Sequence, residues 1–262
     1  MNQSDSLDGV PAFGPLLARA YARYWLDHST FLARHFDEIA RQFDIRGATL
    51  CDVACGEGTF AVAMAKKGWY VFGVDASQAM TDLAQAKVRE HHVAGTFLRQ
   101  DMRTFTLPEP ADLVTCWYNS LNYLLTQEDL ARTFGAMARA LVPGGWLLFD
   151  VYTLYGLETE WADRPWIAVD VDDCFVVSRT RYDPQTHRAE VTFTGFLREG
   201  SHGEVPHYVR FEERHEHRGY PWTTLKRFLG EAGFEVRGQF TMPGFGTPDK
   251  WTKRVYGAAR KR

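Results

Sequence analysis

The chain has 262 residues, of which 45% are hydrophobic, 14% aromatic and 24% charged. These proportions are typical of a folded globular protein and exclude a disordered chain. The 30 lysines and arginines stand against 33 aspartates and glutamates, so the formal net charge is −3. A general binder of polyanions needs a strong basic excess, and nucleic acid is therefore not an expected partner.

The cysteines and the termini point to an intracellular location. The four cysteines, at positions 51, 55, 116 and 174, form no CxxC pair and are expected to be buried free thiols in a reducing compartment. The first residues, MNQSDSLDGVPAFG, lack the basic region and apolar core of a secretory signal. No stretch reaches the roughly 18 uncharged apolar residues of a membrane helix. The sequence therefore predicts a cytoplasmic protein with no membrane partner.

In the first half of the chain, helical and strand patterns alternate. Two helices are expected between residues 11 and 44, where apolar side chains recur at helical spacing. Strands are expected at 48–54, 69–75, 95–102, 111–118 and 146–152, with helices at 60–68, 78–91 and 127–141 between them and a turn at 143–145 before the last strand. Ser77 is a plausible N-cap for the helix that follows it. This alternation predicts a parallel sheet with helices on both faces.

After Tyr152 the pattern changes. From about Trp166 to His217 the runs alternate with a period of two and show no helical pattern, which indicates an antiparallel insert of about four strands. A helix at 222–233 and strands at 234–240 and 253–261 then return to the earlier pattern.

A glycine-rich turn, DVACGEGTFA at 52–61, lies where the first of these strands meets its helix. Gly56 and Gly58 allow the backbone to approach a ligand closely. With Asp75 at the spacing of a ribose-binding acid, the pattern also fits a nicotinamide dinucleotide site. However, Asp52 and Glu57 would repel a pyrophosphate, and the sequence shows no nearby lysine or arginine to offset them. S-adenosylmethionine, which carries an ammonium and a sulfonium but no phosphate, suits these carboxylates better.

Several segments carry a resemblance to a known family. The segments DVACGEGTF, VDAS, QDM at 100–102, DLVTCWYNSLNYL and LVPGGWLLFDV, in this order and spacing, resemble the class I S-adenosylmethionine-dependent methyltransferases over residues 45–152. More narrowly, YNSLNYL at 118–124, FDVYT, the antiparallel insert and HEHRGYP at 215–221 look like small bacterial enzymes of that class that methylate small molecules, including sugar N,N-dimethyltransferases. The resemblance implies a methyltransferase of the EC 2.1.1 class that uses S-adenosylmethionine and releases S-adenosylhomocysteine.

The resemblance also implies a fold. A Rossmann-like α/β fold is expected, with a seven-stranded, mostly parallel sheet whose last strand is antiparallel. The expected parts are an N-terminal helical cap (1–44), a cofactor-binding core (45–152), an antiparallel β insert that covers the substrate (153–220) and a C-terminal return to the core sheet (221–262).

The same resemblance assigns cofactor contacts. The glycine-rich turn with Asp52 would hold the methionine part, Asp75 the ribose hydroxyls, and Asp101 with the Met102 backbone the adenine. For each acid, a turn former or helix cap is the alternative interpretation. The expected cofactor-binding residues are Tyr24, Asp52, Ala54, Gly56, Gly58, Asp75, Ala76, Met80, Asp101, Met102, Trp117 and Tyr118.

The candidates for catalysis and acceptor binding lie later in the chain. A methyl acceptor must be a neutral amine or a hydroxyl that loses its proton, so a nearby base is useful. His215 and His217 are two apart on an expected strand and share a face. Three interpretations are open for this pair: hydrogen-bonded strand residues, a base or binding group that faces the substrate, or metal ligands. Because no third ligand stands at a fixed spacing, no metal is expected. The catalytic candidates are His215, Tyr118 and Tyr220, and the substrate-binding candidates are Asn119, Asn122, Tyr123, His217 and Arg218.

The main hypothesis is therefore methyl transfer to a nitrogen or oxygen atom of a small-molecule acceptor by a monomer or homodimer. A tRNA-modifying methyltransferase and a non-catalytic S-adenosylmethionine-binding module are the alternatives. A pocket with no volume beside the sulfonium would identify the non-catalytic module.

Overall fold

The computed structural model describes residues 13–200 and 207–262. The first twelve residues of the expected N-terminal cap and residues 201–206 of the expected insert lie outside the described residues. The described chain begins with two helices, α1 (Pro15–Tyr24) and α2 (Asp27–Phe43), as predicted. Its four cysteines are free and buried, also as predicted. Within these ranges, every helix falls short of the length and apolar character needed to span a bilayer.

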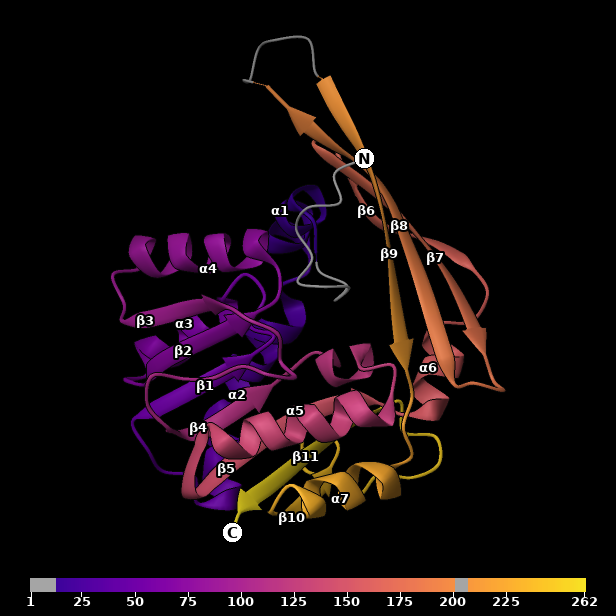
Figure 1. Ribbon diagram of the computed structural model, residues 1–262. Coiled ribbons are helices and arrows are strands. Elements are labelled where there is room, and N and C mark those ends of the chain that lie inside the picture. Colours follow the sequence, from indigo (N-terminus) through magenta and orange to yellow (C-terminus); the bar gives the residue numbers. More distant parts are fainter. Residues whose placement is uncertain (1–12, 201–206) are drawn as a thin grey trace.

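Seven strands form one sheet in the order β3-β2-β1-β4-β5-β11-β10 (Figure 1). In this sheet β11 runs antiparallel to both of its neighbours, while the pairs from β3 to β5 are parallel. The prediction of a mostly parallel sheet with an antiparallel last strand is confirmed. The strands are β1 (Thr49–Val53), β2 (Tyr70–Asp75), β3 (Gly95–Arg99), β4 (Ala111–Cys116), β5 (Leu141–Tyr152), β10 (Phe234–Phe240) and β11 (Arg254–Lys261).

Helices cover both faces of this sheet. On one face α2, α3 (Thr59–Lys66) and α4 (Gln78–Glu90) enclose a core that includes Phe36 and Met64. On the other face α5 (Gln127–Arg139) and α7 (Trp222–Glu231) pack their Phe134 and Phe228 over the sheet (Figure 1). As predicted, Ser77 caps α4, because its Oγ accepts a hydrogen bond from the Met80 N–H at 3.2 Å.

The insert is a four-stranded antiparallel sheet of β6 (Pro165–Val171), β7 (Cys174–Asp183), β8 (Arg188–Glu199) and β9 (His207–Arg218), in that order (Figure 1). Its outer face carries ion pairs between neighbouring strands, such as Arg214 with Glu190. Its inner face packs against α1 through a third core cluster. That cluster contains Leu17, Ala20, Val169, Cys174, Val176, Leu197 and Phe211.

Two short helices were not foreseen. The turn after β4 forms a 3₁₀ helix, η1 (Ser120–Tyr123), and α6 (Leu154–Glu160) precedes the insert. Such short helices have too few turns for their periodicity to show in a sequence window. The start of α6 is instead fixed locally, since Thr153 Oγ1 accepts from the Gly156 N–H at 2.9 Å.

The expected turn at Pro143, Gly144 and Gly145 is part of a longer strand. Helix α5 ends at Arg139 and β5 already begins at Leu141. The pairing of β4 with β5 shifts register in this region, and Gly144 has a φ of +78°. The two glycines therefore permit an irregular strand start where a turn was predicted.

A substitution of Leu17 tests whether this side chain anchors α1 to the insert. Its side chain is 1% exposed, and we expect Leu17→Ala to lower the free energy of unfolding by about 2–5 kcal/mol, because buried contacts are lost and a cavity remains. Urea denaturation measures the change. Arg19→Ala is the control on the same helix, since its ion pair with Glu199 is open to water and should contribute less than about 1 kcal/mol. Equal losses for the two variants would show that α1 is not held through this cluster.

Candidate functional site

A cavity of about 600 Å³ lies between the carboxyl ends of the parallel strands, α1 and the inner face of the insert sheet. This edge is where open α/β sheets bind ligands. We call the part formed by the glycine-rich turn and the ends of β1 and β2 the loop end, with Asp52, Ala54, Gly56 and Asp75 in its wall. We call the part formed by η1, α6 and the insert the insert end. Its wall includes Tyr123, Trp161, Ser178, Phe193 and His217.

The backbone of the loop end is shaped for close approach. Ala54, Gly56 and Gly58 have φ values of +56°, +54° and +83°, all in the left-handed region. A Cβ atom placed on Gly56 would meet nothing within 4 Å, so open space lies in front of this residue. A Cβ on Gly58 would instead lie 2.8 Å from the Ala84 Cβ. Gly56 therefore faces the cavity, whereas Gly58 allows the turn to pack on α4.

The Asp75 carboxylate fixes this turn. Its Oδ2 accepts from the Gly56 N–H and its Oδ1 from the Ser77 N–H, each at 2.9 Å. Burial raises the pKa of Asp75, and these backbone donors oppose the rise. The carboxylate thus shapes the turn and also lines the cavity.

Asp52 places a second carboxylate in the same wall. It is 3% exposed, and Thr115 Oγ1 donates to its Oδ1 at 2.7 Å. Burial raises its pKa to about 7, with the Thr115 hydrogen bond opposing and the Asp75 charge adding to the rise. The ion pairs found among the described residues include neither Asp52 nor Asp75. A cationic ligand at the loop end would therefore meet two carboxylates that lack a cationic partner in this part of the chain.

Glu57 is different, and here the expectation from sequence was wrong. Lys87 reaches it from α4 and forms an ion pair with its carboxylate, while Thr59 Oγ1 also donates to it at 2.8 Å. A lysine thus does offset this acid, although it lies 30 residues further along the chain. Asp52 and Asp75, rather than Glu57, therefore make the loop end suited to a cationic ligand.

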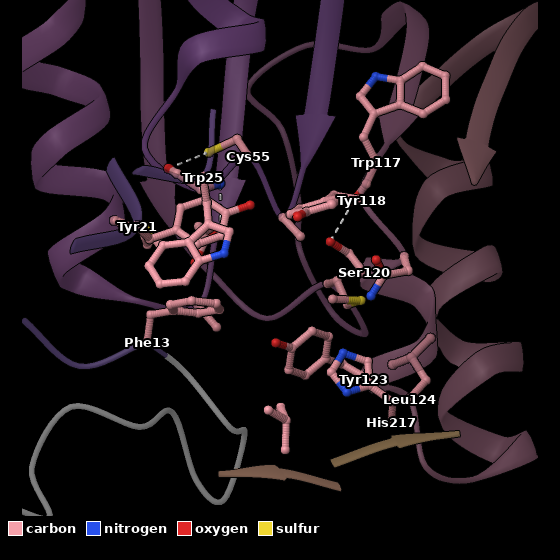
Figure 2. Close-up of a pocket in the computed structure, with 18 of the residues that line it drawn as sticks. Phe13, Tyr21, Trp25, Cys55, Trp117, Tyr118, Ser120, Tyr123, Leu124 and His217 are labelled. Atoms are coloured by element: carbon pink, nitrogen blue, oxygen red, sulfur yellow. Dashed lines mark hydrogen bonds between the residues drawn. The ribbon is translucent and has the colours of Figure 1, made fainter. Parts of the chain in front are cut away.

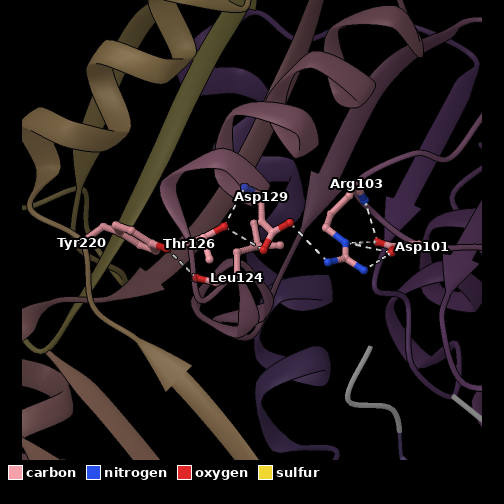
Figure 3. A network of polar contacts seen from close by, with 6 residues as sticks. All are labelled: Asp101, Arg103, Leu124, Thr126, Asp129 and Tyr220. Carbon is pink, nitrogen blue, oxygen red and sulfur yellow. Dashed lines mark hydrogen bonds and ion pairs between the residues drawn. The ribbon is translucent and has the colours of Figure 1, made fainter. Parts of the chain in front are cut away.

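Asp101 is engaged by a neighbouring arginine (Figure 3). Arg103 Nε and Nη2 donate to Asp101 Oδ2 at 2.8 and 2.6 Å, and Nη1 donates to Asp129 Oδ1 at 3.2 Å. Arg103 and both acids line the cavity. The guanidinium group therefore lies beside the place where the resemblance expects the adenine ring.

The turn after β4 carries two residues in the left-handed region, Tyr118 and Asn119, with φ values of 58° and 53°. Two adjacent non-glycine residues seldom adopt this conformation without support. The support is the Asp150 carboxylate, which accepts from the Tyr118 N–H at 2.6 Å and from the Asn119 N–H at 3.0 Å.

Asp150 is itself fully buried and charged. It forms an ion pair with Arg254 of β11, and His28 Nε2 of α2 lies 3.7 Å from its Oδ1. Burial alone would raise the pKa of Asp150, but Arg254, assisted by His28, holds it below its ordinary value. The Tyr118 ring stacks on His28 at 4.8 Å, so the position of this cavity-lining tyrosine depends on the same group.

At the insert end, aromatic rings surround two histidines. The His217 ring lies 4.1 Å from the Tyr123 ring and 4.3 Å from the Trp161 ring, and it lines the cavity (Figure 2). Burial, with His215 nearby, lowers the pKa of His217 well below its ordinary value, so its imidazole is neutral at physiological pH. Buried polar atoms without a hydrogen-bond partner among the described residues include His217 Nδ1 and Ser178 Oγ. These atoms can accept or donate to a polar ligand.

Most of the cofactor candidates line the cavity, whereas several other candidates have different contacts. Tyr24 of α1 does not line the cavity, and its hydroxyl donates to Asp173 at 2.7 Å. The Tyr220 hydroxyl donates to the Leu124 carbonyl at 2.6 Å (Figure 3). The candidates in the wall are Asp52, Ala54, Gly56, Asp75, Ala76, Met80, Asp101, Met102, Trp117, Tyr118, Asn119, Tyr123 and His217, and those outside it are Tyr24, Gly58, Asn122, His215, Arg218 and Tyr220.

Asn122 and Arg218 bond to backbone instead. Asn122 Nδ2 donates to the carbonyls of Tyr152 and Arg218, and its Oδ1 accepts from the Tyr152 N–H at 2.9 Å. The Arg218 guanidinium donates to the Leu125 carbonyl at 2.8 Å. These two residues thus join the insert to the core around η1.

Sequence reasoning missed several residues of the wall. Tyr21, three positions before Tyr24, faces the cavity with Trp25 and Phe13 (Figure 2). The signal was present in part, since Leu17 and Tyr21 are four apart and share one face of α1. Strand alternation could likewise have placed Val191 and Phe193 on the inner face of β8, where they line the cavity.

Comparisons with known proteins find methyltransferases among the similar sequences. A family model described as a methyltransferase domain matches residues 50–145. The chain is 33% identical over 226 residues to a predicted methyltransferase of Geobacillus sp. (strain WCH70), which covers 84% of this chain and 88% of that protein.

Two solved structures share the fold. An S-adenosylmethionine-dependent methyltransferase from Clostridium acetobutylicum ATCC 824 is similar with a TM-score of 0.82 and 22% identity, covering 94% of this chain and 98% of that chain. A sugar N-methyltransferase from Streptoalloteichus sp ATCC 53650 is similar with a TM-score of 0.70 and 22% identity, covering 100% of this chain and 98% of that chain.

Asp150 offers a test of how the site is supported. We expect Asp150→Asn to lower the free energy of unfolding by about 3–5 kcal/mol, because the buried Arg254 loses its counter-charge. Thermal and urea unfolding measure the change. Asp173→Asn is the matched control, since the Asp173–Arg23 pair is open to solvent and should contribute less than about 1 kcal/mol. A loss at Asp150 no larger than the control would contradict a supporting role.

Proposed function

The chain belongs to the class I S-adenosylmethionine-dependent methyltransferases, and we propose that it transfers a methyl group to a nitrogen or oxygen atom of a small molecule. The observation that carries this proposal is the continuity of the cavity. One space reaches from Asp75 at the loop end, past Tyr118, to Trp161 and His217 at the insert end. A cofactor and an acceptor can therefore share a single enclosed volume.

The loop end fits S-adenosylmethionine. When bound, this cofactor supplies a methyl group activated by a sulfonium. We assign its cationic methionine part to the wall of Asp52 and Gly56, because open space lies in front of Gly56. The two acids of the loop end, Asp52 and Asp75, also lack a cationic partner among the described residues. Asp75 would bind the ribose hydroxyls, and Asp101 with Met102 would lie near the adenine.

The insert end supports a small acceptor. A volume of about 600 Å³ for both ligands is in the range of small-molecule sites, and the insert sheet closes it on one side. On the outer face of that sheet several arginines are paired with glutamates, as in Arg179 with Glu212 at 3.8 Å. Such a surface offers little attraction to a polynucleotide. The similar sugar N-methyltransferase from Streptoalloteichus also favours a small acceptor.

The cavity also argues against a non-catalytic module. Such a protein would have no room beside the cofactor, whereas here the wall continues through Tyr123 to His217. Methyl transfer from a sulfonium is an in-line displacement, so the protein mainly aligns the acceptor and excludes water. An enclosed space lined by aromatic rings serves both purposes.

The proposal is tested by calorimetry and by a methyl-transfer screen. Micromolar binding of S-adenosylmethionine and S-adenosylhomocysteine, without binding of reduced nicotinamide dinucleotide, is the expected result. Amines, amino sugars and phenols are then screened for uptake of labelled methyl groups. Binding of the nicotinamide dinucleotide in place of the adenosyl ligands would refute the assignment of the loop end.

Asp75 tests the cofactor site. We expect Asp75→Ala to weaken binding of S-adenosylmethionine by roughly 1.5–3 kcal/mol, as for hydrogen bonds to a charged group. Calorimetric titration measures the affinity. Glu109→Ala removes an exposed acid away from the cavity wall and should bind as the unmodified protein does. If Asp75→Ala binds equally well, the ribose contact is wrong.

Asp52 predicts a pH dependence. Its pKa of about 7 means that the carboxyl group is partly protonated near neutrality, and a cationic ligand favours the ionised form. Affinity for S-adenosylmethionine should therefore rise with pH between about 6 and 8, with proton release on binding. Calorimetry in buffers of different ionisation enthalpy measures the released proton.

Asp52→Asn is the comparison for this prediction, because the ligand's own amino group titrates equally with both proteins. The difference between the two curves isolates Asp52. Parallel curves with equal proton release would show that Asp52 does not sense the bound cation.

A further inference from the structure

We propose that Tyr123, His215 and Glu213 form a proton relay that accepts the proton of an acceptor hydroxyl, so that the product is an O-methyl ether. This inference rests on the proposed function and deepens it by naming the acceptor group. Tyr123 is the catalytic residue, because it lines the cavity, and His215 and Glu213 act through it as positioning residues.

The three side chains lie in a row, in which Tyr123 and His215 share a hydrogen bond and His215 Nε2, which has no hydrogen-bond partner among the described residues, lies within ion-pair distance of Glu213. The Tyr123 hydroxyl and His215 Nδ1 lie 3.2 Å apart and are hydrogen bonded, and His215 Nε2 lies 3.5 Å from Glu213 Oε2. Glu213 Oε2 in turn accepts from the Gly14 N–H at 3.0 Å. In the tautomer with its proton on Nε2, His215 can accept from Tyr123 while directing that N–H toward the Glu213 carboxylate.

The row is shielded behind the cavity wall. His215 is 1% exposed, and the rings of Phe13 and Phe193 lie 4.8 and 5.7 Å from it. His215 therefore does not line the cavity, and Tyr123 stands between it and the cavity space. Figure 2 shows the Tyr123 hydroxyl pointing toward the side of the cavity where Phe13 lies.

The environment of Tyr123 favours passing a proton over holding a negative charge. Burial raises the pKa of Tyr123 far above its ordinary value, and the charges of Asp75 and Glu213 and the neighbouring Tyr118 add to the rise. The hydroxyl thus stays protonated. The Tyr123 hydroxyl can take a proton only while it gives its own proton to another group. His215 is placed to be that group, because its Nδ1 is hydrogen bonded to the hydroxyl.

The insert end suits an acceptor with a hydroxyl group better than one with an ammonium group. The carboxylates near it are already paired, Glu160 with Lys253 at 2.5 Å and Asp129 with Arg103 at 3.2 Å. Ser178 and the neutral His217 in this wall carry no charge, and the guanidinium of Arg188, which also lines it, is paired with Glu216 at 3.6 Å. A neutral hydroxyl acceptor meets matching partners here, but it must lose its proton during the reaction.

For an acceptor R–OH, transfer of the methyl group is accompanied by transfer of the hydroxyl proton. The acceptor oxygen forms a bond to the methyl carbon as the carbon–sulfur bond breaks, and the electron pair of that bond stays on sulfur to give S-adenosylhomocysteine. The acceptor proton moves to Tyr123 Oη, and the proton of Tyr123 moves to His215 Nδ1. The resulting imidazolium faces Glu213, and after the product leaves, the proton on Nδ1 returns to Tyr123 Oη as Tyr123 gives a proton to water in the cavity, which restores both groups.

The first test does not depend on activity. Nitrogen-15 spectra of the histidine rings are compared between the unmodified protein, Tyr123→Phe and Tyr182→Phe. Tyr182 forms a similar pair with His187 at 3.4 Å outside the cavity wall, so it is a matched control. We expect Tyr123→Phe to shift the Nδ1 signal of His215 and Tyr182→Phe to leave it unchanged. An unshifted His215 signal in Tyr123→Phe would overturn the relay.

The second test is kinetic and uses a panel of phenols and amino sugars with labelled S-adenosylmethionine. We expect transfer to hydroxyl groups, and a fall in kcat of about 100-fold or more in Tyr123→Phe and His215→Gln, since acid–base groups contribute on this scale. The KM and the calorimetric affinity for S-adenosylmethionine should not change, which also shows that the variants fold. Tyr182→Phe should keep the original kcat.

Transfer to amines alone, or an unchanged kcat in Tyr123→Phe, would overturn the inference. A large loss in His217→Asn with none in Tyr123→Phe would also overturn it and would assign the base to His217. Failure of the proposed function looks different. In that case the unmodified protein does not bind S-adenosylmethionine in calorimetry, and both proposals fall together.

Discussion

The geometry of the site depends on one buried carboxylate, that of Asp150. It accepts two backbone N–H groups from the left-handed residues after β4 and forms an ion pair with Arg254. A buried charge is costly unless all of its partners are in place, so these groups hold one another in a single arrangement. Because η1 begins directly after this turn, the direction of Tyr123 and the course of the chain into the insert end follow from the same carboxylate.

The cavity joins two electrostatically different halves. At the loop end two carboxylates, Asp52 and Asp75, form a wall suited to a cation. At the insert end aromatic and neutral side chains line the cavity together with Glu160 and Arg188, which are paired with Lys253 and Glu216. This asymmetry supports the proposed arrangement, in which a cationic cofactor binds in one half and an uncharged acceptor binds in the other.

The sequence predicted those parts of the structure that depend on local pattern. Strand and helix periodicity led to the parallel sheet with helices on both faces, the family resemblance led to its seven strands, and the glycine spacing led to Gly56 and its carboxylates. The contacts that escaped prediction join distant segments, such as Lys87 with Glu57 and Arg254 with Asp150, which are 30 and 104 residues apart. No local repeat encodes such pairs. Tyr21 was missed in favour of Tyr24 because both lie on the same short helix. Only the packing of α1 against the insert decides which of the two tyrosines faces the cavity.

Asn122 has a consequence for how this fold can vary. Its amide bonds both to Tyr152, where the chain leaves the main sheet, and to Arg218, where the chain comes back. The two ends of the insert are therefore held at one point, and everything between them is topologically a single closed loop. Lengthening such a loop costs only a slowly growing entropy. The insert sheet can thus be exchanged or extended as a module while the core sheet and its loop end keep their structure.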